Sequence, residues 1–300
     1  MAINNDNKRF SFSGHESFQC RSLWLKKGYD FVNEGNSFNN EDAVVRLGVG
    51  KNMVTSIRFW MKAFDLLDTD DNLTQIAHQI FSDSYGFDPF LEDEATLWLL
   101  HFHLVSKGFA TTYDLLFNEF RKGKIEFTKD NFVSFVKRKS DVLKVSTPSD
   151  KTIKADFDVM AKIYNRTNAQ NNDKEESFSG VLSELTIMNT FFRGDVEYFV
   201  IDNTEKSQIP AEILLYGILI STGNDVSIDF SKIEQEYNSI GNIFAINRTG
   251  IIEKIEEMVN LYPKQIVFSD QAGIKLLQFK EDRLNPFEVL KKYYEPVYAK

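Results

Sequence analysis

Residues 41–64, EDAVVRLGVGKNMVTSIRFWMKAF, have the pattern of two short helices joined by a glycine-containing turn. Small or apolar residues at Ala43, Val44 and Leu47 predict a first helix that packs inward. Gly48 supplies a residue that adopts positive φ without steric cost, as such a turn requires. The stretch therefore predicts a helix-turn-helix.

The second predicted helix buries one face and exposes the other. Val49 is expected to fill the corner between the helices, and Val54 and Ile57 follow at the spacing of a buried helical face. The solvent side of its first turns is expected to carry Gly50, Lys51, Asn52, Thr55, Ser56 and Arg58.

In a helix-turn-helix the second helix enters the major groove, with its amino-terminal residues toward the base edges. Lys and Arg contact phosphate or guanine there, Asn pairs with adenine, and Thr or Ser holds phosphate. The sequence thus predicts binding of double-stranded DNA. The predicted contact residues are Arg46, Lys51, Asn52, Thr55, Ser56, Arg58 and Lys62.

A short hairpin is predicted after the second helix, which completes the order helix, helix, hairpin of a winged helix. Its tip, residues 68–72, carries Asp68, Asp70 and Asp71, and carboxylates repel phosphate. Two alternatives stay open: the hairpin points away from DNA, or this surface binds a protein. The alternative to a DNA-binding helix-turn-helix is a helical hairpin that serves only for packing or partner binding.

Charge is unevenly distributed along the chain. With 35 Lys and Arg against 44 Asp and Glu, the net charge of −9 argues against a protein that coats nucleic acid non-specifically. However, residues 43–64 hold four basic residues and no acid, and residues 65–94 hold nine acids and no Lys or Arg. Residues 121–139 have a balance of +5. This distribution predicts narrow, directed DNA contact.

The second basic segment is a candidate phosphate-binding patch, although such a run is usually a solvated face. Its members are Arg121, Lys122, Lys124, Lys129, Lys137, Arg138 and Lys139.

The segment GHESF, residues 14–18, is followed by Arg21, and His15 and Arg21 together make a candidate anion site. The alternative is helix capping by Ser13 or Ser17 together with an ion pair between Glu16 and Arg21.

No metal, cofactor or catalytic site is predicted. His101 and His103 lie two residues apart in a helix predicted over 95–106, so their side chains point about 200° apart and cannot chelate one metal. A phosphate-binding loop at 48–52 is excluded, because Val45 and Asn52 occupy positions where that motif needs Gly and Ser or Thr.

The expected fold class is mainly α with small β-hairpins, arranged as tandem winged-helix-like domains. Strands are predicted over 196–201, 266–268 and 274–279, and the last two form a hairpin after an amphipathic helix over 250–261. The outer face of that helix is acidic, which favours a protein interface.

The domain boundaries are predicted from composition. A winged helix-turn-helix domain is expected over 1–94, a helical domain over 95–164, a flexible linker over 165–177 and a second winged-helix-like domain over 178–300. A single cysteine, Cys20, indicates a reducing cytoplasm, and the longest apolar runs are shorter than the roughly 20 residues that span a bilayer.

Three motifs carry a resemblance to a known family. GHESFQCRSLWLKKG at 14–28, DAVVRLGVGKNMVTSIRFWMKAFDLL at 42–67 and FDPFLEDEATLWLLHFHL at 87–104 resemble the bacterial domain-of-unknown-function family 4007. Genes of that family often stand beside phosphorothioate DNA-modification genes, including sulfurtransferases of the PAPS-reductase type. The resemblance implies a role in DNA sulfur modification or an associated defence system, and it implies no catalytic residues.

The expected function is that of a DNA-binding accessory or regulatory protein of such a system. Its expected partners are double-stranded DNA, ordinary or phosphorothioate-modified, and a DNA sulfur-modification enzyme. A scaffold that recruits a DNA-modifying enzyme without binding DNA is the first alternative. A nuclease or other DNA-processing enzyme is the second.

Overall fold

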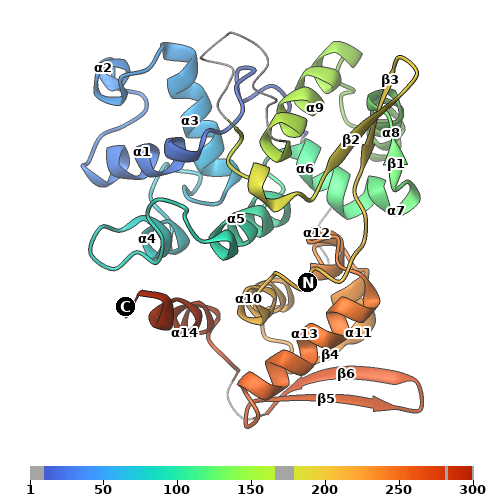
Figure 1. Cartoon of the computed structure of the whole chain (residues 1–300). Helices are drawn as coiled ribbons and strands as arrows, with labels where there is room; N and C mark the ends of the chain where they lie inside the picture. The colour runs from blue at the N-terminus through green and yellow to red at the C-terminus, as the bar shows by residue number, and fades with distance from the viewer. Residues whose placement is uncertain (1–9, 166–178, 281–282, 299–300) are drawn as a thin grey trace.

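The computed structural model describes residues 10–165, 179–280 and 283–298 (Figure 1). The chain is mainly helical, with two antiparallel sheets of three strands each. Its buried apolar side chains form one cluster that extends from Cys20 to Tyr294. No helix within the described ranges is long and apolar enough to cross a membrane. The linker expected over 165–177 lies, apart from its first residue, outside the described residues.

The amino-terminal group of helices contains the predicted helix-turn-helix. Leu67 and Leu73 form an isolated antiparallel bridge, so the predicted hairpin is reduced to a single paired position. The side chain of Thr74 then accepts a hydrogen bond from the backbone N–H of Ala77 and starts the next helix. The four helices are α1 (Ser22–Asn33), α2 (Ala43–Leu47), α3 (Lys51–Ala63) and α4 (Gln75–Phe81).

The middle of the chain starts with a helix that is buried on nearly every side. This helix, α5 (Glu94–Ser106), is apolar almost throughout, so other elements cover all its faces. The helices that follow are α6 (Thr111–Leu115), the π-helix η2 (Leu116–Phe120), α7 (Arg121–Gly123), α8 (Lys129–Leu143) and α9 (Asp150–Tyr164).

A three-stranded sheet joins this part of the chain to a later hairpin. β1 (Glu126–Phe127) pairs with β3 (Val196–Val200), which also pairs with β2 (Asn189–Arg193), in the order β1–β3–β2. The short helix η3 (Ser183–Leu185) precedes β2. The sequence predicts β3 but neither of its partners, because β1 is only two residues long and reaches β3 across α8 and α9.

The carboxy-terminal elements confirm the predicted helix and hairpin. The helices are α10 (Ala211–Thr222), α11 (Phe230–Glu234), α12 (Ile240–Ile243), α13 (Arg248–Leu261) and α14 (Pro286–Tyr298). The strands are β4 (Ser227–Asp229), β5 (Ile266–Gln271) and β6 (Ile274–Phe279), in the sheet order β4–β6–β5. In Figure 1, α10, α13, α14 and this sheet lie in the lower part of the molecule.

One order of elements occurs twice. In each case a strand is followed by helices and then by a hairpin whose second strand lies between the first strand and the hairpin's own first strand. The first occurrence is β1, α8, α9, β2 and β3, and the second is β4, α11, α12, α13, β5 and β6. The sequence predicts the last helix and the hairpin of the second occurrence, but of the strands of the first occurrence it predicts only β3.

Candidate nucleic-acid interface

The turn between α2 and α3 has the predicted geometry. Gly48 ends α2 in the left-handed region at φ 60° and ψ 36°, and Gly50 is extended at φ −68° and ψ 159°. Val49 packs, half-buried, against the core. The chain therefore reverses within these residues, and α3 starts at the surface.

The first turns of α3 expose three of the predicted contact residues. Lys51, Asn52 and Thr55 are exposed, and the Thr55 hydroxyl donates to the carbonyl oxygen of Lys51 at 3.4 Å. The first turn of the helix contains no acidic residue. An ammonium, an amide and a hydroxyl thus lie together on one accessible helix start, which is the chemistry that reads phosphates and base edges.

The inner face of α3 corrects one predicted contact. Val54, Ile57 and Trp60 are buried as expected, but Ser56 is also fully buried. Ser56 lies one helical turn before Trp60 and therefore shares its inward direction. The prediction that Ser56 lies on the solvent side is wrong, as is the inward position predicted for Val44, which is 36% exposed.

The cations further along α3 are held by the loop that follows the helix. The guanidinium of Arg58 pairs with the carboxylate of Asp71 and also donates to the side-chain oxygen of Asn39 at 3.1 Å. Lys62 lies 2.8 Å from the same carboxylate and donates to the carbonyl oxygen of Thr69 at 3.1 Å. Two predicted DNA contacts are therefore already bound within the protein.

One carboxylate of the acidic tip, that of Asp71, faces α3. Burial raises the pKa of Asp71, but hydrogen bonds and charge from Arg58 and Lys62 outweigh it and lower that pKa overall. The carboxylate of Asp68 accepts hydrogen bonds from the backbone N–H groups of Asp70 and Asn72 and so fixes the conformation of the loop. The side chain directed at α3 is thus neutralised by cations.

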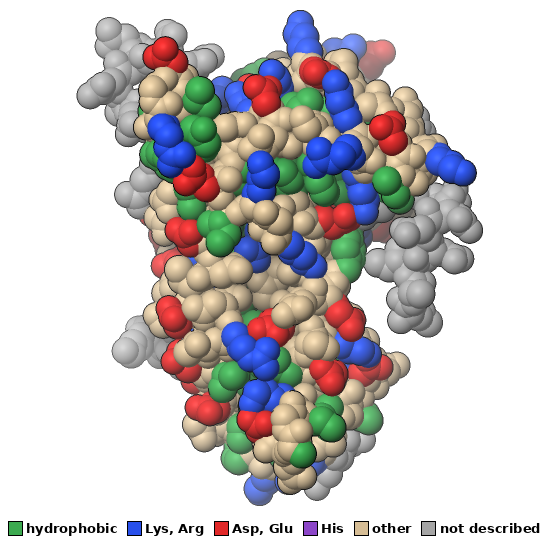
Figure 2. Space-filling view, turned by 90° about the vertical axis from the view of Figure 1, so that its right-hand side faces the viewer, with side chains coloured by type: hydrophobic (Ala, Val, Ile, Leu, Met, Phe, Trp, Pro, Cys, Tyr) green, Lys and Arg blue, Asp and Glu red, His purple; other side chains and the backbone are tan. Residues whose placement is uncertain are grey.

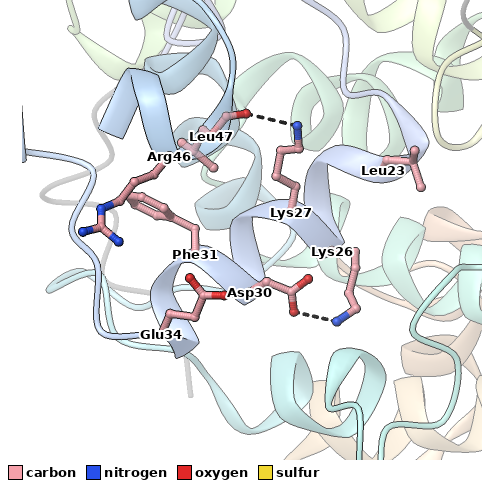
Figure 3. A pocket seen from close by; sticks show the side chains of 8 residues that line it. All are labelled: Leu23, Lys26, Lys27, Asp30, Phe31, Glu34, Arg46 and Leu47. Carbon is pink, nitrogen blue, oxygen red and sulfur yellow. Dashed lines mark hydrogen bonds and ion pairs between the residues drawn. The ribbon is translucent and has the colours of Figure 1, made fainter. Parts of the chain in front are cut away.

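Arg46 lies beside a shallow pocket between α1 and α2, about 290 Å³ in volume (Figure 3). Its Nε is 2.6 Å from Oδ2 of Asp42, and both side chains are about half exposed. Across the pocket, Lys27 donates to the carbonyl oxygen of Leu47 at 3.0 Å and so covers the end of α2. The pocket is lined by Leu23, Lys26, Lys27, Asp30, Phe31, Glu34, Arg46 and Leu47. Its charges are mixed, which makes it a poor site for an anion.

Arg121, from the second predicted patch, is a structural residue. Its guanidinium donates to the carbonyl oxygens of Gly241 and Asn242 at 2.9 Å each and to the side-chain oxygen of Asn203 at 2.6 Å. The side chain is buried, and burial lowers its pKa to about 10. The prediction that Arg121 belongs to a surface patch is wrong, because the segment packs against α12.

Most other members of that patch are also engaged. The lysines at 129, 137 and 139 form ion pairs with carboxylates, and those at 122 and 124 donate to oxygens of neighbouring segments. Arg138 is exposed on α8. The patch therefore exists as a charged surface whose cations are largely paired.

His15 and Arg21 do not form the predicted anion site. His15 is buried and stacked on Trp60, and its Nε2 lies 3.3 Å from a carboxylate oxygen of Asp156. The guanidinium of Arg21 lies 5.3 Å from the ring centroid of Trp24. His15 faces a carboxylate, which would repel an anion. The capping alternative has no support at Ser13, which instead donates its backbone N–H to Asp156 at 2.8 Å.

The two histidines of α5 are core residues. Nε2 of His101 contacts the carbonyl oxygen of Ile243 and Nδ1 contacts the hydroxyl of Tyr164, both at 2.8 Å. Burial lowers the pKa of His101 to about 4. On the opposite side of the helix, His103 lies between the hydroxyl of Tyr216 and the carboxylate of Asp65. Within the described residues, no three His, Cys, Asp or Glu side chains are grouped to hold a metal ion.

Two carboxylates that pair with candidate site residues, those of Asp71 and Asp156, are not identifiable from the sequence pattern. Asp71 is interpreted only as part of an acidic tip, and Asp156 is not considered. Neither pairing is visible in a periodic pattern, since Asp71 lies on a loop and Asp156 reaches His15 from a distant helix. Opposite charges flanking a predicted turn would have been the available signal for Asp71.

The fold is similar to that of solved structures. A magnesium-ion-bound SspB crystal structure superposes with a TM-score of 0.85 at 25% identity, and it covers all of this chain and 92% of the other. A second SspB crystal structure gives 0.84 at 26% identity, with 99% and 91% coverage. No curated protein matches the sequence. The model of the family of unknown function DUF4007 matches residues 12–294, and the chain belongs to that family.

Proposed function

We propose that this protein binds double-stranded DNA through α3 and acts as an accessory or regulatory component of a bacterial DNA phosphorothioate-modification or defence system. The observation that carries the DNA contact is the exposed start of α3. Lys51, Asn52 and Thr55 are accessible there, and the nearby carboxylate of Asp71 is occupied by cations of the same helix.

The order of elements supports this assignment. Two helices with a left-handed glycine between them, followed by a bridged turn, are typical of a winged helix whose second helix enters the major groove. The carboxy-terminal order, with its sheet β4–β6–β5, is also that of a winged helix. A tandem arrangement is therefore part of the proposal.

The biological context is inferred from relatives. Membership in DUF4007 and the likeness to SspB support a role beside DNA sulfur-modification genes. Family membership supplies no reaction, so the proposal is restricted to binding and contains no catalytic step.

A salt titration tests the DNA contact. The full chain is titrated onto a fluorescent duplex of about 25 base pairs, and the same is done with Lys51→Ala combined with Asn52→Ala. Loss of one phosphate contact should reduce the dependence of log affinity on log salt by about 0.9. Lys264→Ala is the control, since this lysine is exposed next to β5, far along the chain. An unchanged affinity and slope in the double variant would contradict the proposal.

A protein scaffold is the second candidate, and a specific surface favours it. Val45 is 81% exposed and Leu23 is 65% exposed, with Val44 also at the surface, so α1 and α2 present apolar side chains to solvent. Co-purification with a sulfurtransferase that Val45→Lys abolishes, together with absence of a DNA shift at low salt, would favour this function over the first. The relative's bound magnesium gives a reason to include Mg²⁺ and to check the duplex for cleavage.

A further inference from the structure

The part of the chain from β1 to β3, called here the middle unit, resembles the part from β4 to β6, because in both a strand is followed by helices and a hairpin, with the same sheet order. In a winged helix, the helix before the hairpin faces DNA and the hairpin contacts the backbone or the minor groove. In the middle unit α9 is the last α-helix before the β2–β3 hairpin, and the short helix η3 lies between them. We propose that α9 and this hairpin form a further contact with double-stranded DNA, separate from α3.

The first support is the exposed face of α9. Four exposed residues follow one another at helical spacing along it: Lys151, Ala155, Asp158 and Lys162. Asp158, the acid among them, is ion-paired with Lys129 of α8. The small side chain of Ala155 allows close approach at the centre of the face. Lys151 and Lys162, which form no ion pair among the described residues, therefore lie on either side of the small Ala155 and the ion-paired Asp158.

Ion pairs between α8 and α9 also support the proposed DNA contact. Residues 121–164 contain eleven Lys and Arg against six Asp and Glu, in a chain of net charge −9. Asp130 and Asp150 are paired with Lys154 and Lys137, at 2.7 and 2.5 Å. These pairs neutralise the acids next to α9, so the remaining positive charge attracts phosphate rather than a basic protein surface.

The hairpin supplies an oriented arginine. Arg193 stands next to the turn at Gly194, and its guanidinium lies 4.9 Å from the ring centroid of Tyr198 and 5.5 Å from that of Phe191. It also pairs with Glu126 at 3.0 Å, while its side chain stays 63% exposed. The aromatic rings thus hold the guanidinium at the surface, as minor-groove arginines require.

The other face of the hairpin exposes an apolar side chain. Phe192 is 69% exposed near the end of the hairpin, where it contributes little to the core. Proteins that contact the minor groove combine Arg with such apolar wedges. Successive side chains of a strand point to opposite faces, so Phe192 and Arg193 offer an apolar and a charged contact on the two sides of the hairpin.

The two parts of this contact lie on the same side of the molecule. In Figure 1, α9 and the end of the β2–β3 hairpin both lie along the upper edge. Figure 2, which shows the right-hand side of the view in Figure 1, has many Lys and Arg side chains over its upper half, with Asp and Glu interspersed. A duplex along the upper edge would meet both elements.

The test uses the full chain, a fluorescent duplex of about 30 base pairs and a series of salt concentrations. Lys151→Ala combined with Lys162→Ala should weaken binding and reduce the slope of log affinity against log salt by about 1.8, for two lost phosphate contacts. Arg193→Ala should weaken binding as well. Asp158→Asn should tighten it, because it removes a negative charge from the face, and a damaged fold would not produce that gain. Lys264→Ala is the control.

The outcomes separate this contact from that of α3. Weaker binding in the α9 and Arg193 variants, with Asp158→Asn tighter, supports the proposal. Wild-type affinity and slope in the α9 and Arg193 variants, while Lys51→Ala with Asn52→Ala weakens binding, overturns this proposal and leaves the α3 contact standing. If α9 variants lose a protein partner but keep wild-type DNA binding, the surface is a protein interface and the proposal is also overturned.

Discussion

Arg58 on α3 and Asp71 in the following loop form a two-point ion pair. Nη2 of Arg58 lies 2.5 Å from Oδ2 of Asp71, and Nε lies 3.1 Å from Oδ1. Lys62 approaches the same carboxylate at 2.8 Å. One acid thus meets two cations of the helix proposed to bind DNA. A phosphate group that contacts Arg58 must therefore compete with Asp71.

Removing this carboxylate should tighten DNA binding. In Asp71→Asn the shape is kept, but Arg58 and Lys62 become free to contact phosphate, so affinity should rise and its salt dependence should steepen by roughly 0.9 for each new contact. Fluorescence anisotropy at several salt concentrations measures both. Asp70→Asn is the matched control, since it removes the same charge from an exposed neighbour in the loop. Equal gains in the two variants would show that general charge, and not the ion pair, controls affinity.

The turn between α2 and α3 should tolerate a side chain at one glycine only. Neither Gly48 nor Gly50 has an atom within 4 Å of an added Cβ, but Gly48 has φ +60° and Gly50 has φ −68°. Gly48→Ser should lower the free energy of unfolding by about 1–2 kcal/mol. Gly50→Ser should be neutral or stabilising, since Ser is a favourable residue before a helix. Urea denaturation of both variants checks this, and equal losses would refute the conformational explanation.

Arg121 should be required for stability and not for DNA affinity. In Arg121→Ala the buried carbonyl oxygens of Gly241 and Asn242 lose their donor, and the free energy of unfolding should fall by about 3 kcal/mol. Arg121→Lys should restore part of this loss, because one ammonium can reach one carbonyl. Lys124→Ala, at an exposed position, should change stability by less than about 0.5 kcal/mol. Thermal and urea denaturation provide the comparison.

Stability should fall as pH decreases from about 6.5 to about 4, in part because of His101. A carbonyl oxygen only accepts, so the neutral ring donates from Nε2 to Ile243 and accepts at Nδ1 from Tyr164. Burial lowers the pKa to about 4 in the folded protein, whereas the unfolded chain has about 6.5. Between these values the unfolded chain binds more protons, so His101 destabilises the fold progressively as pH falls, by up to about 3 kcal/mol.

His101→Gln tests the assignment of this pH dependence. The amide keeps a donor and an acceptor but does not titrate, so the slope of unfolding free energy between pH 4 and pH 6.5 should become flatter than in the unmodified protein. Urea denaturation at four or five pH values measures the slope. Parallel curves for the two proteins would assign the dependence to other groups.

Local patterns are sufficient to predict much of the fold. The helix-turn-helix limits, the positive φ at Gly48 and the burial of Val54 and Ile57 follow from spacing and from glycine stereochemistry. The helix over 250–261 and its hairpin follow from amphipathic periodicity and a turn between alternating strands. Each of these signals lies within one short stretch, where neighbouring residues determine the backbone conformation.

Contacts between segments far apart in the sequence decide the remaining features of the fold, and the candidate nucleic-acid interface depends on them. Ser56 and Arg121 look polar and accessible in the sequence, but Ser56 lies on the buried face of α3 and Arg121 packs against α12. The middle unit is not visible in local patterns either, because β1 and its partner β3 are separated in the sequence by α8 and α9.

The sequence alone therefore determined most of the residues that could line the helix proposed to bind DNA, since helical periodicity assigns faces by position. Only the tertiary structure decided which of those cations remain available. Arg58 and Lys62 are bound to Asp71 while Lys51 is left exposed, because ion pairing depends on distances between segments that no local pattern encodes.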